Sequence, residues 1–260
     1  MLGQLSLERV NRYASLGILP LMLLAIAVFS RAANGETTAA SPTEGTLVVA
    51  NLRSETLTFI DLADDRRAEL ALPGPPHELL FEAGRLYVTL GRGDQLVEVD
   101  VQAKAILRTI KLAGEPHGIA SLGGNLYVTL DKANAVVVID RATLTELRRI
   151  PTGDTPHVIA ATGSAILVTD SRENTIGQLE PFPATAPSGA QPEGIAVVGN
   201  RAVAANALDG TLTIFDLPGL GSPRSLAVGG SPVRVFAIDA SQVVASVQGS
   251  DQVVLLDPMT

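Results

Sequence analysis

The sequence predicts an all-β fold, a β-propeller of about six four-stranded blades, from a repeat, a regular spacing of turns and the residues at those turns. The pattern LYVTL occurs at 86–90 and again at 126–130, inside matching segments that run from Arg85 to Gly124 and from Asn125 to Ser164. A unit of this size cannot bury its own apolar faces and must stack against copies of itself. Four short strands per repeat, with Gly, Asn, Asp and Pro between them, are typical of propeller blades.

Each repeat predicts a hairpin of two central strands. The first strand of the hairpin is the YVTL-type segment, expected at 46–50, 86–90, 126–130, 166–169, 202–206 and 243–247. The second ends in an acidic residue, namely Asp61, Asp100, Asp140, Glu180, Asp216 or Asp257. Continuous apolar runs such as VVVID (136–140) suit strands that are covered on both faces. Six hairpins, and therefore six blades, are expected.

Both terminal units are predicted to be incomplete. The first begins at Thr46 without an inner strand, and the last stops after Asp257 without an outer one, so the sequence does not say how the propeller closes. The fourth unit has a proline-rich stretch, 177–194, and its outer strand is expected to be broken or absent. This stretch is interpreted either as protection of an edge strand or as a docking loop for a partner.

Residues 1–35 are predicted to be a signal peptide or a membrane anchor. Arg9 and Arg12 precede an apolar run over 14–29, and small residues follow it. Cleavage after Ala32 or Gly35 would release the domain, whereas an uncleaved run would attach it to a membrane through residues 14–29. Either outcome places residues 46–260, the propeller domain, in the periplasm or outside the cell. Residues 36–45 are predicted to be a flexible tether.

Composition excludes several classes of function. A formal net charge of −8 disfavours nucleic acid as a partner. The absence of cysteine excludes thiolate catalysis, and the absence of tryptophan excludes stacking of a ligand on an indole ring. The sequence has no G-x-S-x-G, no G-x-x-x-x-G-K and no H-E-x-x-H motif. No set of catalytic residues is predicted.

The LYVTL segments, the acid after the second hairpin strand and the motif Pro-x-Gly-Ile-Ala at 116–120 and 192–196 together resemble the YVTN family of β-propeller repeats. The resemblance covers about residues 46–257 and implies a propeller at the cell surface or in the periplasm. The sequence departs from the family in offering six units where many members have seven blades, and in having Leu90 and Leu130 where the family has Asn. Propellers related to this family have diverse activities, so the resemblance implies no single function.

The three histidines of the chain, His77, His117 and His157, occupy equivalent positions, each directly after a proline. Glu193 takes this position in the fourth copy, and Val233, followed by Arg234, takes it in the fifth. These residues are expected at the mouth of the central channel, where they would contact a ligand. The three imidazoles suit a divalent metal ion such as Zn²⁺, and Glu193 would be a further ligand.

Two interpretations of the histidines remain open at this point. They are either metal ligands or copies of a structural residue that hydrogen-bonds a neighbouring blade, and the close spacing that a metal requires favours the structural one. The acidic residues after the second hairpin strand are expected to accept hydrogen bonds from turn N–H groups rather than to bind calcium.

The expected function is that of an extracytoplasmic binding or scaffold protein without catalytic activity. A protein or small-molecule ligand would contact the channel mouth or the blade edges, and no cofactor is expected. The alternative is a metal-dependent hydrolase or lyase, with the histidines holding the metal and Glu193 as a ligand or general base. A third possibility is an assembly subunit whose open edge is completed by another chain.

Overall fold

A computed structural model of the chain describes residues 26–29 and 45–259, which contain 23 β-strands and no α-helix. These residues contain no helix that could cross a membrane. The structure divides into two compact units at the boundary between Thr109 and Ile110. The predicted leader and tether lie outside the described residues, apart from Ile26–Phe29 and Gly45.

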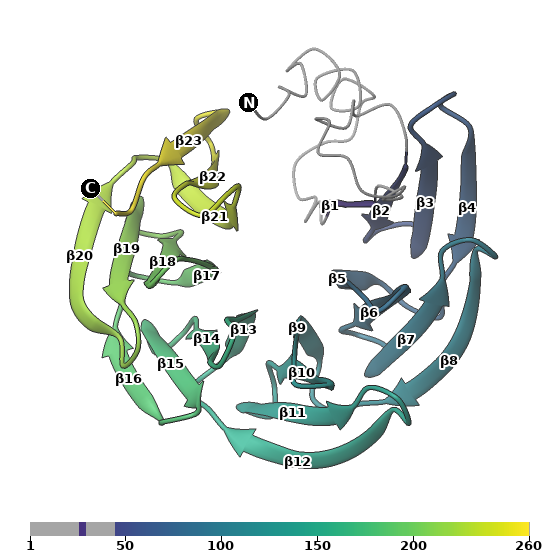
Figure 1. The fold of residues 1–260 in the computed structure, drawn as a ribbon, viewed down its shortest axis with the longest axis horizontal. Helices are drawn as coiled ribbons and strands as arrows, with labels where there is room; N and C mark the ends of the chain where they lie inside the picture. The colour runs from purple at the N-terminus through teal and green to yellow at the C-terminus, as the bar shows by residue number, and fades with distance from the viewer. Residues whose placement is uncertain (1–25, 30–44, 260) are drawn as a thin grey trace, which may run out of the picture. The chain divides into compact units, whose positions relative to one another are not determined.

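The first unit contains two four-stranded sheets, β1-β2-β3-β4 and β5-β6-β7-β8 (Figure 1). The strand β8 runs across the unit boundary. The bounds are β1 Ile26–Phe29, β2 Thr46–Asn51, β3 Thr56–Asp61, β4 Arg67–Ala71, β5 Pro76–Glu82, β6 Arg85–Leu90, β7 Gln95–Asp100 and β8 Ala105–Lys111.

The second unit contains three four-stranded sheets and a last sheet in which three strands are described. Consecutive strands pair antiparallel within each sheet. The bounds are β9 Pro116–Leu122, β10 Asn125–Leu130, β11 Ala135–Asp140, β12 Thr145–Pro151, β13 Pro156–Ala161, β14 Ile166–Asp170, β15 Thr175–Glu180, β16 Ala184–Pro187, β17 Pro192–Val198, β18 Arg201–Asn206, β19 Thr211–Asp216, β20 Gly221–Ala227, β21 Ser231–Ala237, β22 Val243–Gln248 and β23 Gln252–Leu256.

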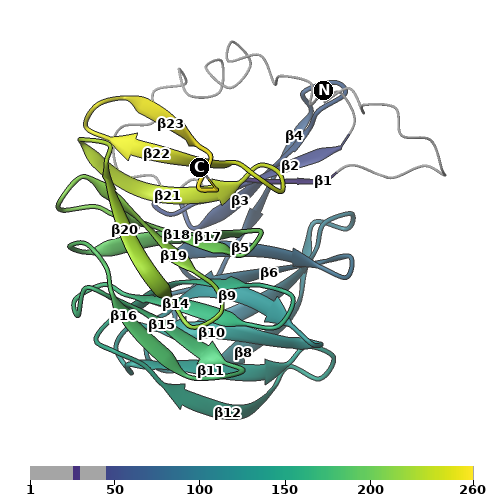
Figure 2. The same ribbon diagram turned by 60° about the vertical axis from the view of Figure 1, so that its left-hand side comes forward.

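The four sheets of the second unit stack face to face (Figure 2). The first strands of successive sheets, β9, β13, β17 and β21, are neighbours on the inner side, while β12, β16 and β20 lie outside (Figure 1). Burial follows this order. The central strands β10 and β14 are almost wholly buried, whereas the outer strands β12 and β20 are almost wholly exposed.

Aliphatic side chains fill the spaces between adjacent sheets. One cluster in the second unit joins the sheet of β9–β12 to that of β13–β16, with Val136 and Val138 packed against Ile166 and Val168. Two further clusters repeat this arrangement toward the C-terminus, and a fourth lies between the two sheets of the first unit. The pairing of apolar faces that the repeat predicts is therefore present within each unit.

All six predicted hairpins are present, and two of them are clamped by an asparagine. Asn206, the last residue of β18, donates through Nδ2 to the hydroxyls of Thr211 at 3.0 Å and Thr213 at 2.8 Å. Asn51 makes the same pair of bonds to the two threonines of β3. Leu90 and Leu130 take this position in the two repeats that show the LYVTL pattern. The asparagine therefore supports the hairpin and is replaceable by an apolar residue.

The acidic residue at the end of the second hairpin strand has the predicted structural role in four sheets. Four aspartates each accept a hydrogen bond from the backbone N–H of a residue two or three positions later in the chain, namely Asp61, Asp100, Asp140 and Asp257. These bonds hold the pKa of Asp100 and Asp140 below the ordinary value. Glu180 and Asp216 differ, because they pair with Arg148 and Arg201 instead.

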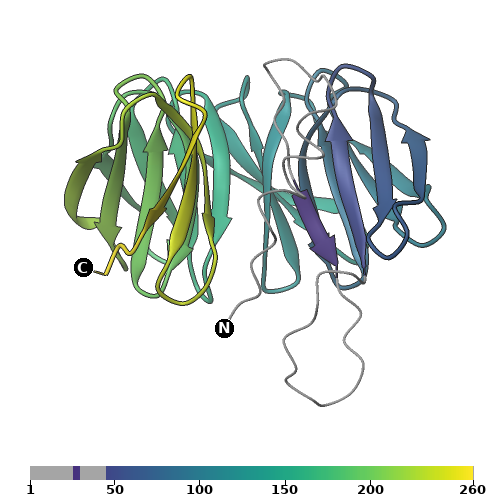
Figure 3. The same cartoon turned by 90° about the horizontal axis from the view of Figure 1, so that it is seen from above.

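Two expectations about the strands are wrong. The fourth repeat does have an outer strand, the four-residue β16, although it contains the proline-rich stretch. The first sheet has an innermost strand, because Ile26–Phe29 pair with Val49–Thr46 of β2 (Figure 3, short purple arrow). This strand comes from the predicted leader, so cleavage after Ala32 or Gly35 would remove it from the sheet.

Candidate functional site

The innermost strands of the second unit begin with an unusual backbone conformation. Glu115, Thr155 and Gln191 all have positive φ, between 54° and 59°, and each is followed by the proline that opens β9, β13 or β17. Positive φ is unfavourable for residues other than glycine, especially for a β-branched threonine. Such strain persists where the surrounding structure enforces it, commonly at functional sites.

A β-bulge follows each of these prolines. The register between the innermost strand and its neighbour shifts at this point in β9, β13, β17 and β21, and also in β5 of the first unit. A bulge interrupts the strict alternation of side chains along a strand and redirects the residue within it. The residue redirected here is the one after the proline, His117, His157 or Glu193.

A hydroxyl group from the second strand of the sheet holds the bulge in β9, β13 and β21. Thr129 accepts a hydrogen bond from the N–H of Gly118 at 2.7 Å and donates one to the carbonyl oxygen of His157 at 2.8 Å. Thr169 accepts from the N–H of Val158, and Ser246 accepts from the N–H of Arg234. The threonine of the YVTL pattern is therefore the residue that fixes the neighbouring histidine.

Glycine allows two innermost strands to approach each other closely. A Cβ atom on Gly118 would lie 2.6 Å from the carbonyl oxygen of His157, and one on Gly194 would lie 2.4 Å from that of Val233. Both contacts involve backbone atoms, which cannot rotate away. The glycine of the Pro-x-Gly-Ile-Ala motif thus brings the backbone of one sheet against that of the next.

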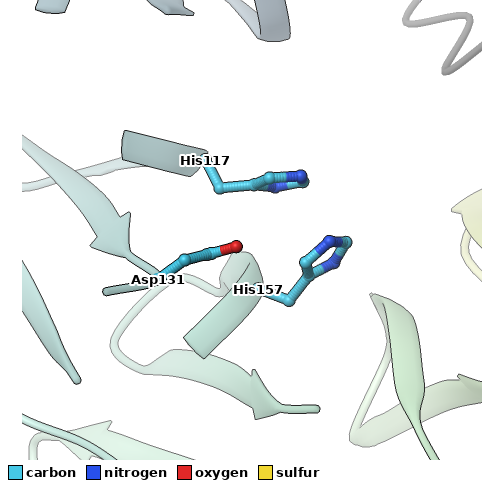
Figure 4. A group of neighbouring side chains, drawn as sticks. All are labelled: His117, Asp131 and His157. Atoms are coloured by element: carbon cyan, nitrogen blue, oxygen red, sulfur yellow. The ribbon is translucent and has the colours of Figure 1, made fainter. Parts of the chain in front are cut away.

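This close approach brings His117, Asp131 and His157 together (Figure 4). One ligand atom from each residue lies within 4.8 Å of the other two. The imidazole rings of His117 and His157 are 3.8 Å apart between centroids and tilted by 33°. The carboxyl group of Asp131 points toward the two rings (Figure 4).

Asp131 is held in place by its own backbone. It follows β10 directly, and its N–H donates to the carbonyl oxygen of Glu115, two residues before His117. The N–H groups of Ser171 and Ala207, at the same position of the next two repeats, make the corresponding bond. In the sheets that begin with β9, β13 and β17, the turn after the second strand therefore lies beside the redirected residue of the first strand.

Glu193 extends the cluster on the side of His157. Its Oε2 lies 3.3 Å from Nδ1 of His157, and its Oε1 accepts a bond from the side-chain amide of Gln191. The guanidinium of Arg234 is close enough to act electrostatically on His157. Three of the residues predicted to meet a ligand therefore do lie together around His157.

Burial controls the protonation of this cluster. It raises the pKa of Asp131 to about 7, and the negative charges of Glu115 and Glu193 add to the rise. Burial also lowers the pKa of His157, against the opposing effect of Glu193. The lowered pKa of His157 favours the neutral imidazole, the form that can donate a lone pair to a metal ion.

The predicted site residues are divided between the two units. His117, His157, Glu193 and Arg234 belong to the second unit and gather as described. His77 lies half-buried at the start of β5 in the first unit, in the same kind of bulge. Asp131 was not predicted, although aligning the repeats puts it in the turn beside the histidine position, where the other copies have Ser171 and Ala207.

Two imidazoles and a carboxylate are a donor set that suits Zn²⁺ and other divalent transition metals. The same side chains could instead bind a polar ligand, with Glu193 and Arg234 offering charges of opposite sign. In both uses the histidines, Glu193 and Arg234 stand on strands, and Asp131 stands in the turn that follows β10 directly.

No family model matches the sequence, and no curated protein matches it. Solved structures do resemble it in fold. A Kuenenia stuttgartiensis hydrazine synthase structure matches with a TM-score of 0.70 and 19% identity, over 82% of this chain and 73% of that one. The β-propeller domain of Cps50 (Swd1) from Myceliophteria thermophila matches with a TM-score of 0.68 and 14% identity, over 82% and 80%. The WD40 repeats of RRP9 match with a TM-score of 0.65 and 15% identity, over 81% and 76%.

The fold is a β-propeller. Its six sheets in the described residues are the six blades that the repeat predicts. Identities below 20% show the fold of the propeller and leave its function to the residues of the site.

Proposed function

We propose that this chain is an extracytoplasmic β-propeller of the YVTN type that acts as a binding and scaffold protein rather than an enzyme. Its partner is a protein or a small-molecule ligand. The contact site consists of His117, His157, Glu193 and Arg234 at the start of the innermost strands, with the blade edges as the other candidate surface.

The observation that carries this proposal is the placement of polar side chains on rigid backbone. His157 and Glu193 are 14% and 17% exposed, so both reach solvent, while hydrogen bonds with the hydroxyls of Thr129 and Thr169 hold β13 and one from Ser171 holds β17. A site that is held in shape before binding loses little conformational entropy when a partner arrives. The repeated fold supplies this rigidity, and a binding function of this kind requires no set of catalytic residues.

The proposed location rests on residues 1–35. Their basic start, apolar run and small-residue exit are those of a secretory signal or anchor, with membrane attachment through residues 14–29 in the uncleaved form. The negative net charge supports the exclusion of nucleic acid as a partner. Cell fractionation with protease protection tests the location, and a protein found wholly in the cytoplasm would contradict it.

Paired variants test the contact site. We expect cross-linking in native envelopes to recover one partner with the wild-type chain and with Glu146→Gln, an exposed residue of the outer strand β12. Glu193→Gln together with Arg234→Ala should reduce that recovery at least about tenfold, the effect of removing two contacts of about 1 kcal/mol each. Loss of partner recovery with Glu146→Gln alone would assign the contact to the blade edge. Failure to recover a specific partner from any sample would contradict the binding function.

A metal-dependent hydrolase or lyase is the second candidate, favoured by the group of His117, Asp131 and His157 beside Glu193. In this function Glu193 acts as a general base next to the metal. Turnover of ester and lactone substrates by the Zn²⁺-treated protein would then be lost in His117→Ala while the urea midpoint changes little. Absence of turnover over the whole substrate panel favours the binding protein.

A further inference from the structure

We propose that His117, Asp131 and His157 bind one Zn²⁺ ion, and that Glu193 is a positioning residue that orients His157 for it. This site differs from the ring of three histidines that the sequence predicts, since a carboxylate takes the place of His77. It goes beyond the proposed binding function and does not depend on it.

The geometry of the cluster is close to that of a coordinated metal. Zinc–nitrogen and zinc–oxygen bonds of about 2.0–2.2 Å place tetrahedral ligand atoms roughly 3.3–3.5 Å apart. The ligand atoms of the three residues lie within 4.8 Å of one another. Rotation of the carboxyl group of Asp131 and of the two imidazoles about their side-chain bonds covers a difference of roughly 1.5 Å, so no strand needs to move.

The backbone holds the three ligands independently of the metal. His117 and His157 stand on bulges joined by Thr129, which bonds to both Gly118 and the carbonyl oxygen of His157. Asp131 is tied to the same region through the carbonyl oxygen of Glu115. A site formed in advance in this way gains affinity because little ordering remains to be done on binding.

Glu193 gives His157 the orientation of a metal ligand. Histidine ligands commonly donate the N–H of the second ring nitrogen to a carboxylate, which fixes the tautomer and makes the first nitrogen a better donor. Oε2 of Glu193 lies 3.3 Å from Nδ1 of His157, which makes no hydrogen bond in the described structure, so a small rotation of the imidazole would form this bond and leave Nε2 for the metal. The amide of Gln191 in turn holds Glu193.

The charges around the site also favour a cation. The charges of Glu115 and Glu193 act on Asp131, against smaller effects of Lys132 and Arg172, and Oδ1 of Asp131 is buried without a hydrogen-bond donor in the described part of the chain. A buried oxygen without a donor is costly unless something replaces water there. A Zn²⁺ ion would supply that partner and offset the repulsion between the carboxylates.

Isothermal titration of Zn²⁺ into the full-length, tag-free chain, after treatment with a chelator, tests the site. We expect one tightly bound ion per chain. Asp131→Asn, which keeps the shape of the side chain, and His117→Gln should each weaken binding at least about 100-fold, and Glu193→Gln about 10- to 100-fold. Asp154→Asn, an exposed carboxylate of the same unit, should leave the affinity unchanged. Circular dichroism of each variant checks that it is folded.

Three results would overturn the proposal. If the wild-type chain binds no Zn²⁺, the proposed site does not exist. If wild type, Asp131→Asn and His117→Gln bind Zn²⁺ equally, the bound ions are adventitious surface ions only. A loss in His77→Ala as large as that in Asp131→Asn would restore the ring of three histidines. The recovery of a partner in envelopes is measured separately, so either proposal can fail alone.

Discussion

Gly118→Ala is expected to destabilise the domain by about 1–3 kcal/mol, the usual effect of forcing an extra group into a closely packed interior. The added Cβ would meet the carbonyl oxygen of His157 at 2.6 Å and the amide nitrogen of Ile159 at 3.0 Å. Since neither atom belongs to a side chain, β9 and β13 must separate. Urea denaturation followed by circular dichroism measures the change in unfolding free energy.

A matched glycine distinguishes this contact from the general effect of a methyl group. Gly163 lies in a turn with no atom within 4 Å of its hypothetical Cβ, so Gly163→Ala should be neutral or stabilising by up to about 1 kcal/mol. Because His157 lies at the point of contact, Gly118→Ala should also weaken Zn²⁺ binding, whereas Gly163→Ala should not. Equal stability of the two variants would show that the strands are not in close contact.

Asp170→Asn is expected to stabilise the domain at pH 8 and to have little effect at pH 4. Asp170 is 3% exposed, and burial raises its pKa from 3.8 to about 7, with Glu173 adding to the rise. The folded chain therefore keeps a proton that the unfolded chain releases above about pH 4. Stability from this group is complete at low pH and is lost as pH rises to about 7.

The size of the effect follows from the difference in pKa. A rise of about three units corresponds to as much as about 4 kcal/mol of unfolding free energy between pH 4 and pH 8. The amide that replaces the carboxyl group of Asp170 would carry no charge, and it could donate to Thr175 as Asn206 does to Thr211 in the next repeat. Urea midpoints of both proteins across this range measure the difference, and parallel pH profiles would contradict the buried charge. Asp154→Asn, at an exposed position of the same unit, is the matched control variant.

Most of the fold could be predicted because the repeat is explicit in the sequence. The LYVTL copies fix the spacing of the blades, and the acidic residues mark the ends of the second hairpin strands. The two wrong expectations about strands have a common cause, because the amino-acid composition of a short segment does not show which strand it pairs with. The short strand β16 needs only Thr175–Gln178 as its partner, which tolerates the prolines around it, and the apolar sequence of residues 26–29 is compatible with a leader and with a β-strand alike.

The candidate site could be predicted only in part. The histidines stood out because they are few and occupy equivalent positions, and Glu193 and Arg234 followed from the same alignment. Asp131 was not predicted, because its role depends on a contact between a turn and another strand. The spacing of residues along one strand carries no information about such a contact. Gly118 belongs to the Pro-x-Gly-Ile-Ala motif, but its structural role depends on the backbone of β13 opposite it, which the motif does not show.

X-ray absorption spectroscopy of the zinc-loaded chain tests most directly whether these residues form one site. The structure predicts two imidazole ligands, His117 and His157, with about 2.0–2.1 Å zinc–nitrogen bonds, completed by oxygen from Asp131 and solvent. A spectrum with three imidazoles, or with oxygen ligands alone, would contradict this assignment.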